Sequence, residues 1–222
     1  VRYLTGGVLI RLNRRTQQLE PELARAWKVT ENGRAIRFEL RKGVKFSDGA
    51  PFTAEDVAFT VRRMMDPQLV SPIGDSFRSG AGPVQAEALA ADVVRVRFPA
   101  PVAGMERLFD QLSIQSARAP DAGPAVLGPF VLAERKAGVF LRLKRNPHYW
   151  KTDAGGARLP YLDSVRLEIQ HNREMELMRF QRGEVHLINT LDPEMFDRLQ
   201  KTSPGATLDA GPRAHRGGTY VC

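Results

Sequence analysis

The stretch RKGVKFSDGAPFTAEDVAFTVRRMMDP, residues 41–67, decides the first half of the fold. It opens as a strand, breaks at the Ser-Asp-Gly turn of residues 47–49 and restarts as a helix. Thr53 stands where an N-cap belongs, and Asp56 follows three residues later, which is an acidic form of the capping box. Pro67 ends the helix, because the residue before a proline avoids the helical region. The stretch therefore predicts a strand, a tight turn and a capped helix.

Asp48 lies in that turn, next to the helix start, and its position admits two interpretations. Backbone N–H groups and the helix dipole favour anions at a helix N-terminus, and a carboxylate there is also a potential metal ligand. Aspartate side chains also stabilise turns by bonding the backbone two residues on. The residues of this stretch do not separate a binding site from a plain connection.

Composition and charge narrow the class of protein. The chain has 222 residues, 42% hydrophobic and 26% charged, which is typical of a globular protein. No apolar run is long enough to cross a bilayer. The single cysteine, Cys222, excludes an intrachain disulfide. The net charge of +8 suits nucleic acid, but the arginines are scattered and alternate with acids, as in Arg37-Phe38-Glu39. Such alternation is typical of the solvent face of strands, so we expect no nucleic-acid partner.

Hydrophobic spacing predicts the elements before the opening stretch. Residues 21–27 suit a short helix, because Pro21 fits a first turn and Leu23 and Trp27 share a helical face. Asn32-Gly33 is a hairpin signal. Apolar residues alternate with charged ones from residue 36 to residue 41, which predicts a strand with one buried face.

The middle of the chain alternates loops and strands. Residues 69–84 are rich in Gly, Ser and Pro and predict an irregular segment. ADVVRVRF, residues 91–98, predicts a strand that the following proline stops. Residues 105–113 suit a short helix. GPFVLAERKAGVFLRLKRN, residues 128–146, predicts a hairpin that turns near residues 137–138.

From residue 162 the pattern changes to alternating strands and helices. Strands are predicted at residues 165–169, at VHLIN (185–189), at ATLDA and at GTYVC. One helix is capped by Asn172 and ended by Gly183, and the next opens at Asp192-Pro193. This order predicts a parallel sheet with helices packed against it, whereas the first half is more antiparallel. The predicted fold class is α/β in a mixed α+β form.

Residue chemistry gives no positive sign of catalysis. His171 and Glu174 are three apart and share a helical face, but two residues are too few for a metal site. There is no G-x-S-x-G elbow, and the Gly-rich pieces match neither G-x-G-x-x-G nor a P-loop. We therefore expect a binding protein that is not an enzyme and carries no cofactor and no metal.

Several motifs, taken together and in order, point to one family. LEPELARAWKVTENGRAIRFELRKGVKFSDGAPFTAEDVAFTVRRMMDP closely resembles the signature region of the family 5 extracellular solute-binding proteins, the peptide, dipeptide and nickel-class receptors of ABC importers. LGPFVLAERKAGVFLRLKRNPHYW is similar to the Gly-Pro-Phe hairpin of that family and its Arg-Asn-Pro-x-Tyr-Trp motif. PYLDSVRLEI, MRFQRGEVHLIN and LDPEMFDRLQ resemble the segment that follows. The resemblance runs from about Leu19 to the end.

The resemblance implies a two-lobed, periplasmic-binding-protein-like receptor with an extra β-rich domain inserted in the first lobe. Residues 1–33 and 158–222 are expected in the first lobe, and residues 34–157 in the extra domain. GGTYVC reads as the start of a strand without an ending, so we expect the chain to be a fragment that lacks the second lobe. The resemblance also implies structural roles for two acids: Asp48 belongs to the turn and Asp56 caps the helix.

The resemblance further implies a role and a set of ligand contacts. The expected role is to capture a peptide or another small solute outside the inner membrane and deliver it to the permease and ATPase subunits. A removed signal peptide, a periplasmic location and membrane association through the permease or a lipid anchor go with that role. The expected ligand-binding residues are Ile73, Phe77 and Tyr220. Peptide receptors of the family often carry an aromatic residue where Ile73 follows Ser71-Pro72, so an atypical ligand is expected.

Two other functions stay open. Some transcription regulators carry a solute-binding-protein domain as a sensor, and a helix-turn-helix ahead of this region would favour that role. A signal peptide or lipobox there would favour transport. A hydrolase ranks third, and turnover by the full-length protein would support it.

Overall fold

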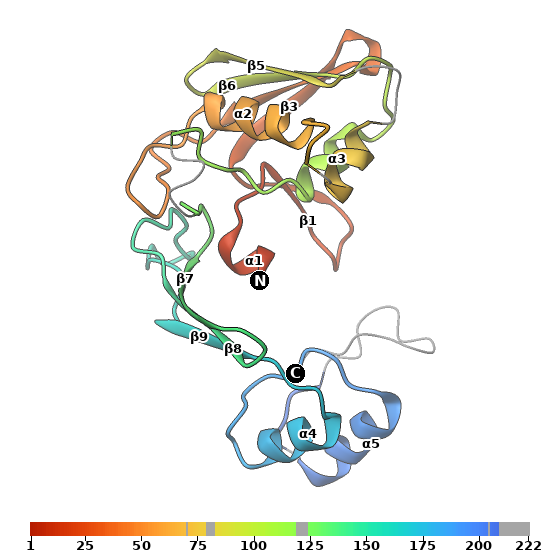
Figure 1. The fold of residues 1–222 in the computed structure, drawn as a ribbon, viewed down its shortest axis with the longest axis vertical. Helices are drawn as coiled ribbons and strands as arrows, with labels where there is room; N and C mark the ends of the chain where they lie inside the picture. Colours follow the sequence, from red (N-terminus) through yellow and green to blue (C-terminus); the bar gives the residue numbers. More distant parts are fainter. Residues whose placement is uncertain (70, 79–82, 119–123, 204, 209–222) are drawn as a thin grey trace. The chain divides into compact units, whose positions relative to one another are not determined.

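The computed structural model describes residues 1–69, 71–78, 83–118, 124–203 and 205–208 (Figure 1). The chain separates into two compact units. The first consists of residues 1–135 and 141–166, and the second of residues 136–140 and the described residues from Leu167 on. Among the described helices, none is long and apolar enough to span a membrane. The lobe boundaries predicted at residues 33/34 and 157/158 stay a prediction.

A four-stranded antiparallel sheet forms the centre of the first unit, in the order β3-β4-β6-β5. Its strands are β3 (Ala24–Thr30), β4 (Ala35–Leu40), β5 (Gln85–Ala90) and β6 (Val93–Arg97). The turn η1 (Glu31–Gly33) joins β3 to β4, which confirms the hairpin predicted at Asn32-Gly33. Every second residue of β4 from Ile36 on is buried, as the alternation predicts.

The helix predicted at residues 21–27 is wrong. Leu19–Pro21 is strand β2, paired with β1 (Ile10–Leu12), and β3 begins at Ala24. Trp27 lies opposite Phe38 in the neighbouring strand. The spacing of four between Leu23 and Trp27 places both on one face of a helix, but an even spacing also places them on one face of a strand. Pairing with β4 decides between the two.

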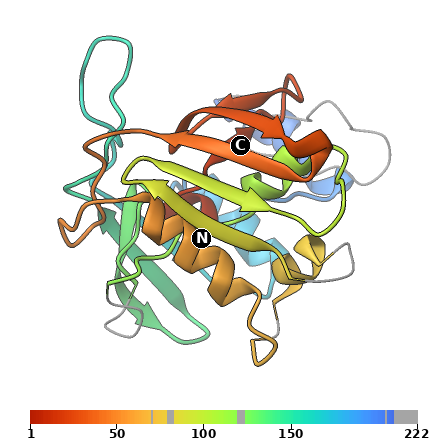
Figure 2. The ribbon, with the colours of Figure 1, turned by 90° about the horizontal axis from the view of Figure 1, so that it is seen from above.

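Helix α2 (Ala54–Met64) covers one face of this sheet and packs against β5 and β6 (Figures 1 and 2). This confirms the helix predicted from the capping box. Val57, Val61 and Met64 lie on its buried face. Burial of each such side chain contributes about 1.5–3 kcal/mol, so packing on the sheet stabilises the helix more than its cap does.

The segment predicted as irregular contains a short helix, α3 (Pro72–Phe77), and a strand, β5, begins right after it. The hydroxyl of Ser71 accepts a hydrogen bond from the N–H of Gly74 at 3.1 Å, and Pro72 occupies the first turn. Ser and Pro are helix-start signals as well as loop formers, so the composition of this segment fits a short helix as well as a loop.

Four phenylalanines join α3, the sheet and the 3₁₀ helix η2 (Met105–Asp110) into one core. The ring of Phe77 stacks on that of Phe98 with centroids 5.9 Å apart, and it meets Phe109 edge-on at 5.3 Å. Phe109 in turn lies 4.7 Å from Phe38 of β4. The short helix predicted at residues 105–113 is confirmed in 3₁₀ form.

A second sheet follows, in the order β7-β8-β9. Its strands are β7 (Phe130–Lys136), β8 (Phe140–Arg145) and β9 (Ser164–Glu168). The predicted hairpin at residues 137–138 is confirmed, with Gly138 at a φ of 71° where a side chain would be strained. The predicted strand at residues 165–169 is β9. A further short helix, α1 (Arg2–Thr5), opens the chain.

The second unit holds helices α4 (Arg173–Gln181) and α5 (Pro193–Thr202). Both predicted caps are confirmed: Asn172 accepts from the N–H of Met175 at 3.0 Å, and Asp192 accepts from the N–H of Met195 at 2.8 Å. A small core joins the two helices and the segment between them; its members are Leu177, Ile188, Leu191, Met195 and Leu199.

The strand predicted at residues 185–189 is wrong, because these residues form no ladder with another described segment. Ile188 is instead buried against the two helices. Residues 206–208 are not a strand either, while the rest of ATLDA and all of GTYVC lie outside the described residues. The described strands therefore form no parallel sheet after residue 162. A strand needs a partner for its backbone hydrogen bonds, and apolar alternation by itself does not supply one.

Candidate functional site

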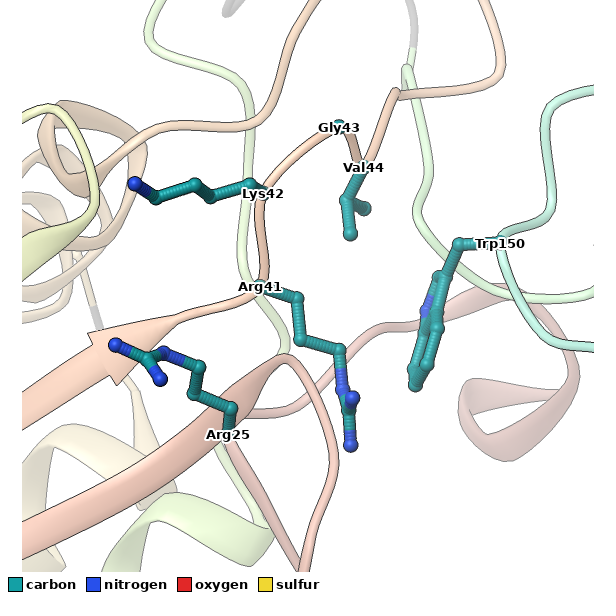
Figure 3. Close-up of a pocket in the computed structure, with 6 residues that line it drawn as sticks. All are labelled: Arg25, Arg41, Lys42, Gly43, Val44 and Trp150. Atoms are coloured by element: carbon teal, nitrogen blue, oxygen red, sulfur yellow. The ribbon is translucent and has the colours of Figure 1, made fainter.

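A pocket of about 600 Å³ opens beside the end of β4 in the first unit. Arg41 and Lys42 directly follow the strand, and residues 43 and 44 begin the chain's path toward α2. Trp150 reaches it from the segment after β8 (Figure 3). The pocket is lined by Arg25, Arg41, Lys42, Gly43, Val44 and Trp150. The lining therefore combines three cations, an indole ring and an aliphatic side chain.

The side chain of Arg41 is held at several points. Its backbone N–H donates to the carbonyl of Leu23 at 2.9 Å, and its Nε donates to the carbonyl of Glu22 at 2.6 Å. Its guanidinium carbon lies 4.7 Å from the centre of the Trp150 ring, a cation–π contact. The terminal nitrogens of Arg41 have no hydrogen-bond acceptor among the described residues. This guanidinium is therefore fixed in place with donors left over.

The other two cations are tied loosely to acids outside the lining. Arg25 pairs with Glu39 at 2.8 Å, but Glu39 also accepts from Arg37. The amine of Lys42 lies 3.4 Å from Asp92, and its side chain is 81% exposed. Exposed pairs of this kind contribute roughly 0–1 kcal/mol and give way to a better partner. The described residues of the lining carry positive charge only.

The buried carboxylate of Glu22 lies next to the pocket and pairs with two cations. Glu22 is 5% exposed, and it pairs with Arg11 at 3.1 Å and with Lys151 at 2.5 Å. Burial, and secondarily the charge of Glu22, raise the pKa of the neighbouring Tyr149 to about 12. Two cations thus surround one buried acid, and breaking such a pair costs about 3–5 kcal/mol. This cluster fixes residues 149–151 against strands β1 and β2.

The Ser-Asp-Gly turn has the geometry of a structural connection. Asp48 accepts from the N–H of Ala50 at 2.9 Å, and Gly49 has a φ of 88°. Ser47 exchanges two hydrogen bonds with Val126, at 2.9 and 3.0 Å. Within residues 1–69, 71–78, 83–118, 124–203 and 205–208, no three His, Cys, Asp or Glu side chains cluster as metal ligands. Among the described residues, the turn interpretation accounts for the hydrogen bond that Asp48 accepts.

Two of the three predicted ligand contacts, Ile73 and Phe77, lie four residues apart in α3. Ile73 is partly exposed at the start of α3. Phe77 is 1% exposed and belongs to the phenylalanine core. Tyr220 lies outside the described residues. Their role in binding a ligand stays a prediction.

Sequence reasoning missed the residues of the pocket. In the sequence, Trp150 ends the Arg-Asn-Pro-x-Tyr-Trp motif and Arg41 ends the alternating stretch of residues 36–41, and no local pattern connects the two. They lie 109 positions apart, and only the fold shows that they stack. The available signal was an arginine at the end of an alternating strand together with a tryptophan in a short aromatic motif, which is weak without contact information.

Comparison with known proteins gives the family. A sequence model described as "Bacterial extracellular solute-binding proteins, family 5 Middle" matches residues 18–220. A probable ABC transporter-binding protein of Deinococcus radiodurans is 26% identical over 94% of this chain and 38% of its own length. Di/tripeptide-binding protein 2 of Pseudomonas aeruginosa is 30% identical over 82% of this chain and 38% of its own length. The periplasmic alpha-galactoside-binding protein of Rhizobium meliloti is 27% identical over 87% of this chain and 32% of its own length.

Solved structures agree on the fold. The crystal structure of an ABC transporter substrate-binding protein from Sinorhizobium meliloti superposes with a TM-score of 0.78 at 21% identity, covering 94% of this chain and 43% of the other. This likeness confirms the predicted fold class, a mixed α and β fold of the periplasmic-binding-protein kind. The chain spans less than half the length of each of these proteins. With nearly its whole length matched by the family model, the chain belongs to the bacterial extracellular solute-binding proteins of family 5.

Proposed function

We propose that the protein containing this chain is the substrate-binding component of an ABC importer. It captures a small solute outside the inner membrane and hands it to a permease driven by an ATPase. The observation that carries the proposal is the family match over residues 18–220. The relatives include proteins named for ABC transport and for periplasmic binding, which supports the same role.

The proposed solute is a peptide or a related small molecule. Relatives of similar identity are named for di- and tripeptides and for an alpha-galactoside, so family membership supports the binding role more strongly than one solute class. Ile73 is more open to a solute than Phe77, since Ile73 is partly exposed whereas Phe77 is enclosed by other rings. An aliphatic residue at this position favours an apolar contact over ring stacking.

The test uses the full-length protein. Isothermal titration against a library of di- to pentapeptides and a set of oligosaccharides should give a saturable, one-site binding curve for one class. A strain that lacks the gene should lose uptake of that same labelled solute, and a plasmid copy should restore it. Binding without any loss of uptake would contradict the importer role and favour a sensor. The absence of binding to every solute would contradict the solute class.

The proposed contact is tested in the same assay. Ile73→Ala should weaken affinity for the solute about tenfold or more, because it removes an apolar contact from the ligand's surroundings. Leu69→Ala is the control, since Leu69 is also an exposed aliphatic residue in the segment between α2 and α3. Equal affinity in wild type and Ile73→Ala would remove Ile73 from the binding site.

A further inference from the structure

The pocket beside β4 places a guanidinium against an indole ring. Its two facing groups, the Arg41 guanidinium and the Trp150 indole, lie next to each other, and in the view of Figure 3 Arg41 stands between Arg25 and Trp150. Its volume of about 600 Å³ lies within the usual range for small-molecule sites. Among the described residues, no acidic side chain lines it.

We propose that this pocket is an anion-binding site for a small molecule that carries a carboxylate or phosphate group next to a flat apolar group. Arg41 would hold the anion through its terminal nitrogens, Arg25 would add a second positive charge, and Trp150 would pack on the flat group. This site is separate from the proposed contact at Ile73.

The guanidinium of Arg41 is held in place before any ligand binds. The Nε of Arg41 already donates a hydrogen bond to the Glu22 carbonyl at 2.6 Å, and the guanidinium carbon lies 4.7 Å from the centre of the Trp150 ring. A group that is already ordered loses little conformational entropy when a ligand arrives. Its remaining N–H donors form the planar fork that matches a carboxylate or phosphate.

Two acids next to the pocket are each shared between two cations. Glu39 is shared between Arg25 and Arg37, so one carboxylate faces two guanidinium groups. Glu22 is likewise shared, here between Arg11 and Lys151, and only its backbone carbonyl serves Arg41. The acids around the pocket are thus outnumbered, and an incoming anion restores the balance.

The indole ring sets the second half of the ligand. Trp150 is partly exposed and lines the pocket, and two cations lie near its ring: the guanidinium carbon of Arg41 at 4.7 Å and the Lys151 amine at 5.3 Å from the ring centre. A ring in this position offers contact area to a flat group while the cations attract the charge beside it. A compact inorganic ion would leave this ring surface uncovered.

The experiment titrates the full-length protein with benzoate, phenyl phosphate and neutral benzamide, by calorimetry and by NMR of the indole N–H groups. Benzamide is the matched probe, since it has the ring of benzoate without its charge. Benzoate, phenyl phosphate or both should bind, with less affinity at high salt, and shift the Trp150 signal. Benzamide should not bind measurably. A site that takes both benzoate and benzamide, or neither of the two anions, overturns the proposal.

Variants locate the binding on the molecule. Arg25→Gln and Arg41→Gln should each weaken anion affinity about tenfold, the usual effect of losing one charged partner. Arg62→Gln is the matched control, because Arg62 is also half-exposed and also paired with a single glutamate, Glu55. Its 52% exposed side chain compares with 57% for Arg25.

If Arg41→Gln fails to fold, Arg25→Gln decides the matter, since its exposed side chain has no role in the core. Equal losses in Arg25→Gln and Arg62→Gln would show a non-specific charge effect and overturn the site. The titrations are repeated with the transported solute at saturation. Unchanged anion affinity under that condition keeps this site distinct from the solute site, and a failed uptake assay would leave this test intact. Competition between the two ligands would overturn the claim of a separate site.

Discussion

The carboxylate of Asp56 accepts a hydrogen bond from the backbone N–H of Ala117 at 2.9 Å, across 61 residues of sequence. Its other oxygen accepts from the N–H of Thr53 at 2.7 Å and from the Thr53 hydroxyl at 3.0 Å. One buried carboxylate therefore starts helix α2 and also fastens the segment that follows η2. The neighbouring hydroxyl of Thr60 strengthens the same junction by accepting from the N–H of Gln115 at 2.9 Å.

This relationship predicts an order of stabilities. Thr53→Ala should cost about 1 kcal/mol, the usual loss for an N-cap. Asp56→Ala should cost about 3 kcal/mol, because it leaves buried N–H donors on two segments without an acceptor. Asp75→Ala, an exposed acid in the first turn of α3, is the control and should stay within about 0.5 kcal/mol. Urea unfolding measures all three, and equal costs for Asp56 and Asp75 would refute the junction.

The Ser-Asp-Gly turn predicts a modest, ion-independent effect. Asp48→Ala should cost about 1 kcal/mol, since it removes the bond from the Ala50 N–H and nothing else. Thermal melts of the parent and the variant should shift equally with magnesium, with calcium and with phosphate. An ion-dependent melting temperature that disappears in Asp48→Ala would restore the binding interpretation of this turn.

Close packing at Gly128 predicts a large steric cost. A Cβ atom there would lie 2.4–2.8 Å from backbone atoms of Thr5, which cannot rotate away. Gly128→Ala should therefore destabilise the protein by about 3 kcal/mol. Gly205→Ala is the control, because a Cβ at that position meets nothing within 4 Å. Differential scanning calorimetry should show a lowered melting temperature for the first variant alone.

The environment of Tyr149 predicts a pH dependence. Burial raises the pKa of its phenol from 10.0 to about 12 in the folded protein, and Glu22 adds to the effect. Because the folded state holds this proton more tightly than the unfolded state does, its contribution to stability is complete below pH 10 and is lost as the pH rises through about 12.

The check is Tyr149→Phe, which stays neutral at every pH. Its stability should fall less steeply than that of the wild type between pH 10 and 12, measured by urea unfolding at each pH. Tyr161→Phe is the comparison: the hydrogen bond that Tyr161 donates to Asp153 also raises the pKa of its exposed phenol, so this variant should have a slope between those of the wild type and Tyr149→Phe. Parallel curves for wild type and Tyr149→Phe would show that the Tyr149 phenol titrates normally.

The phenylalanine core separates a structural role from a ligand role. Phe77→Ala should cost about 3–5 kcal/mol, the usual loss for a buried ring. Ile73→Ala should cost less, because its side chain is only partly buried. If Phe77→Leu keeps the fold and also keeps solute affinity in the full-length protein, the predicted contact at Phe77 is wrong. A selective loss of affinity in that variant would support it.

Local signals determined much of this protein from its sequence. The capping box at Thr53, the hairpin at Asn32-Gly33 and the cap at Asp192 each involve residues within a few positions of one another, so their geometry is written in short spacings. Several motifs in order predict a family 5 solute-binding protein, and the sequence model of that family matches residues 18–220. The alternation of β4 also predicted which of its side chains are buried.

Tertiary structure decided the rest, because the decisive contacts join residues far apart in sequence. Leu23 and Trp27 fit a helix or a strand equally well by spacing, and pairing with β4 selected the strand. The apolar alternation at residues 185–189 found no partner strand among the described residues, so Ile188 joined a helical core instead. Arg41 and Trp150 are 109 residues apart in sequence, and only the fold brings the guanidinium carbon to 4.7 Å from the ring centre. No local spacing rule predicts a contact between residues so far apart.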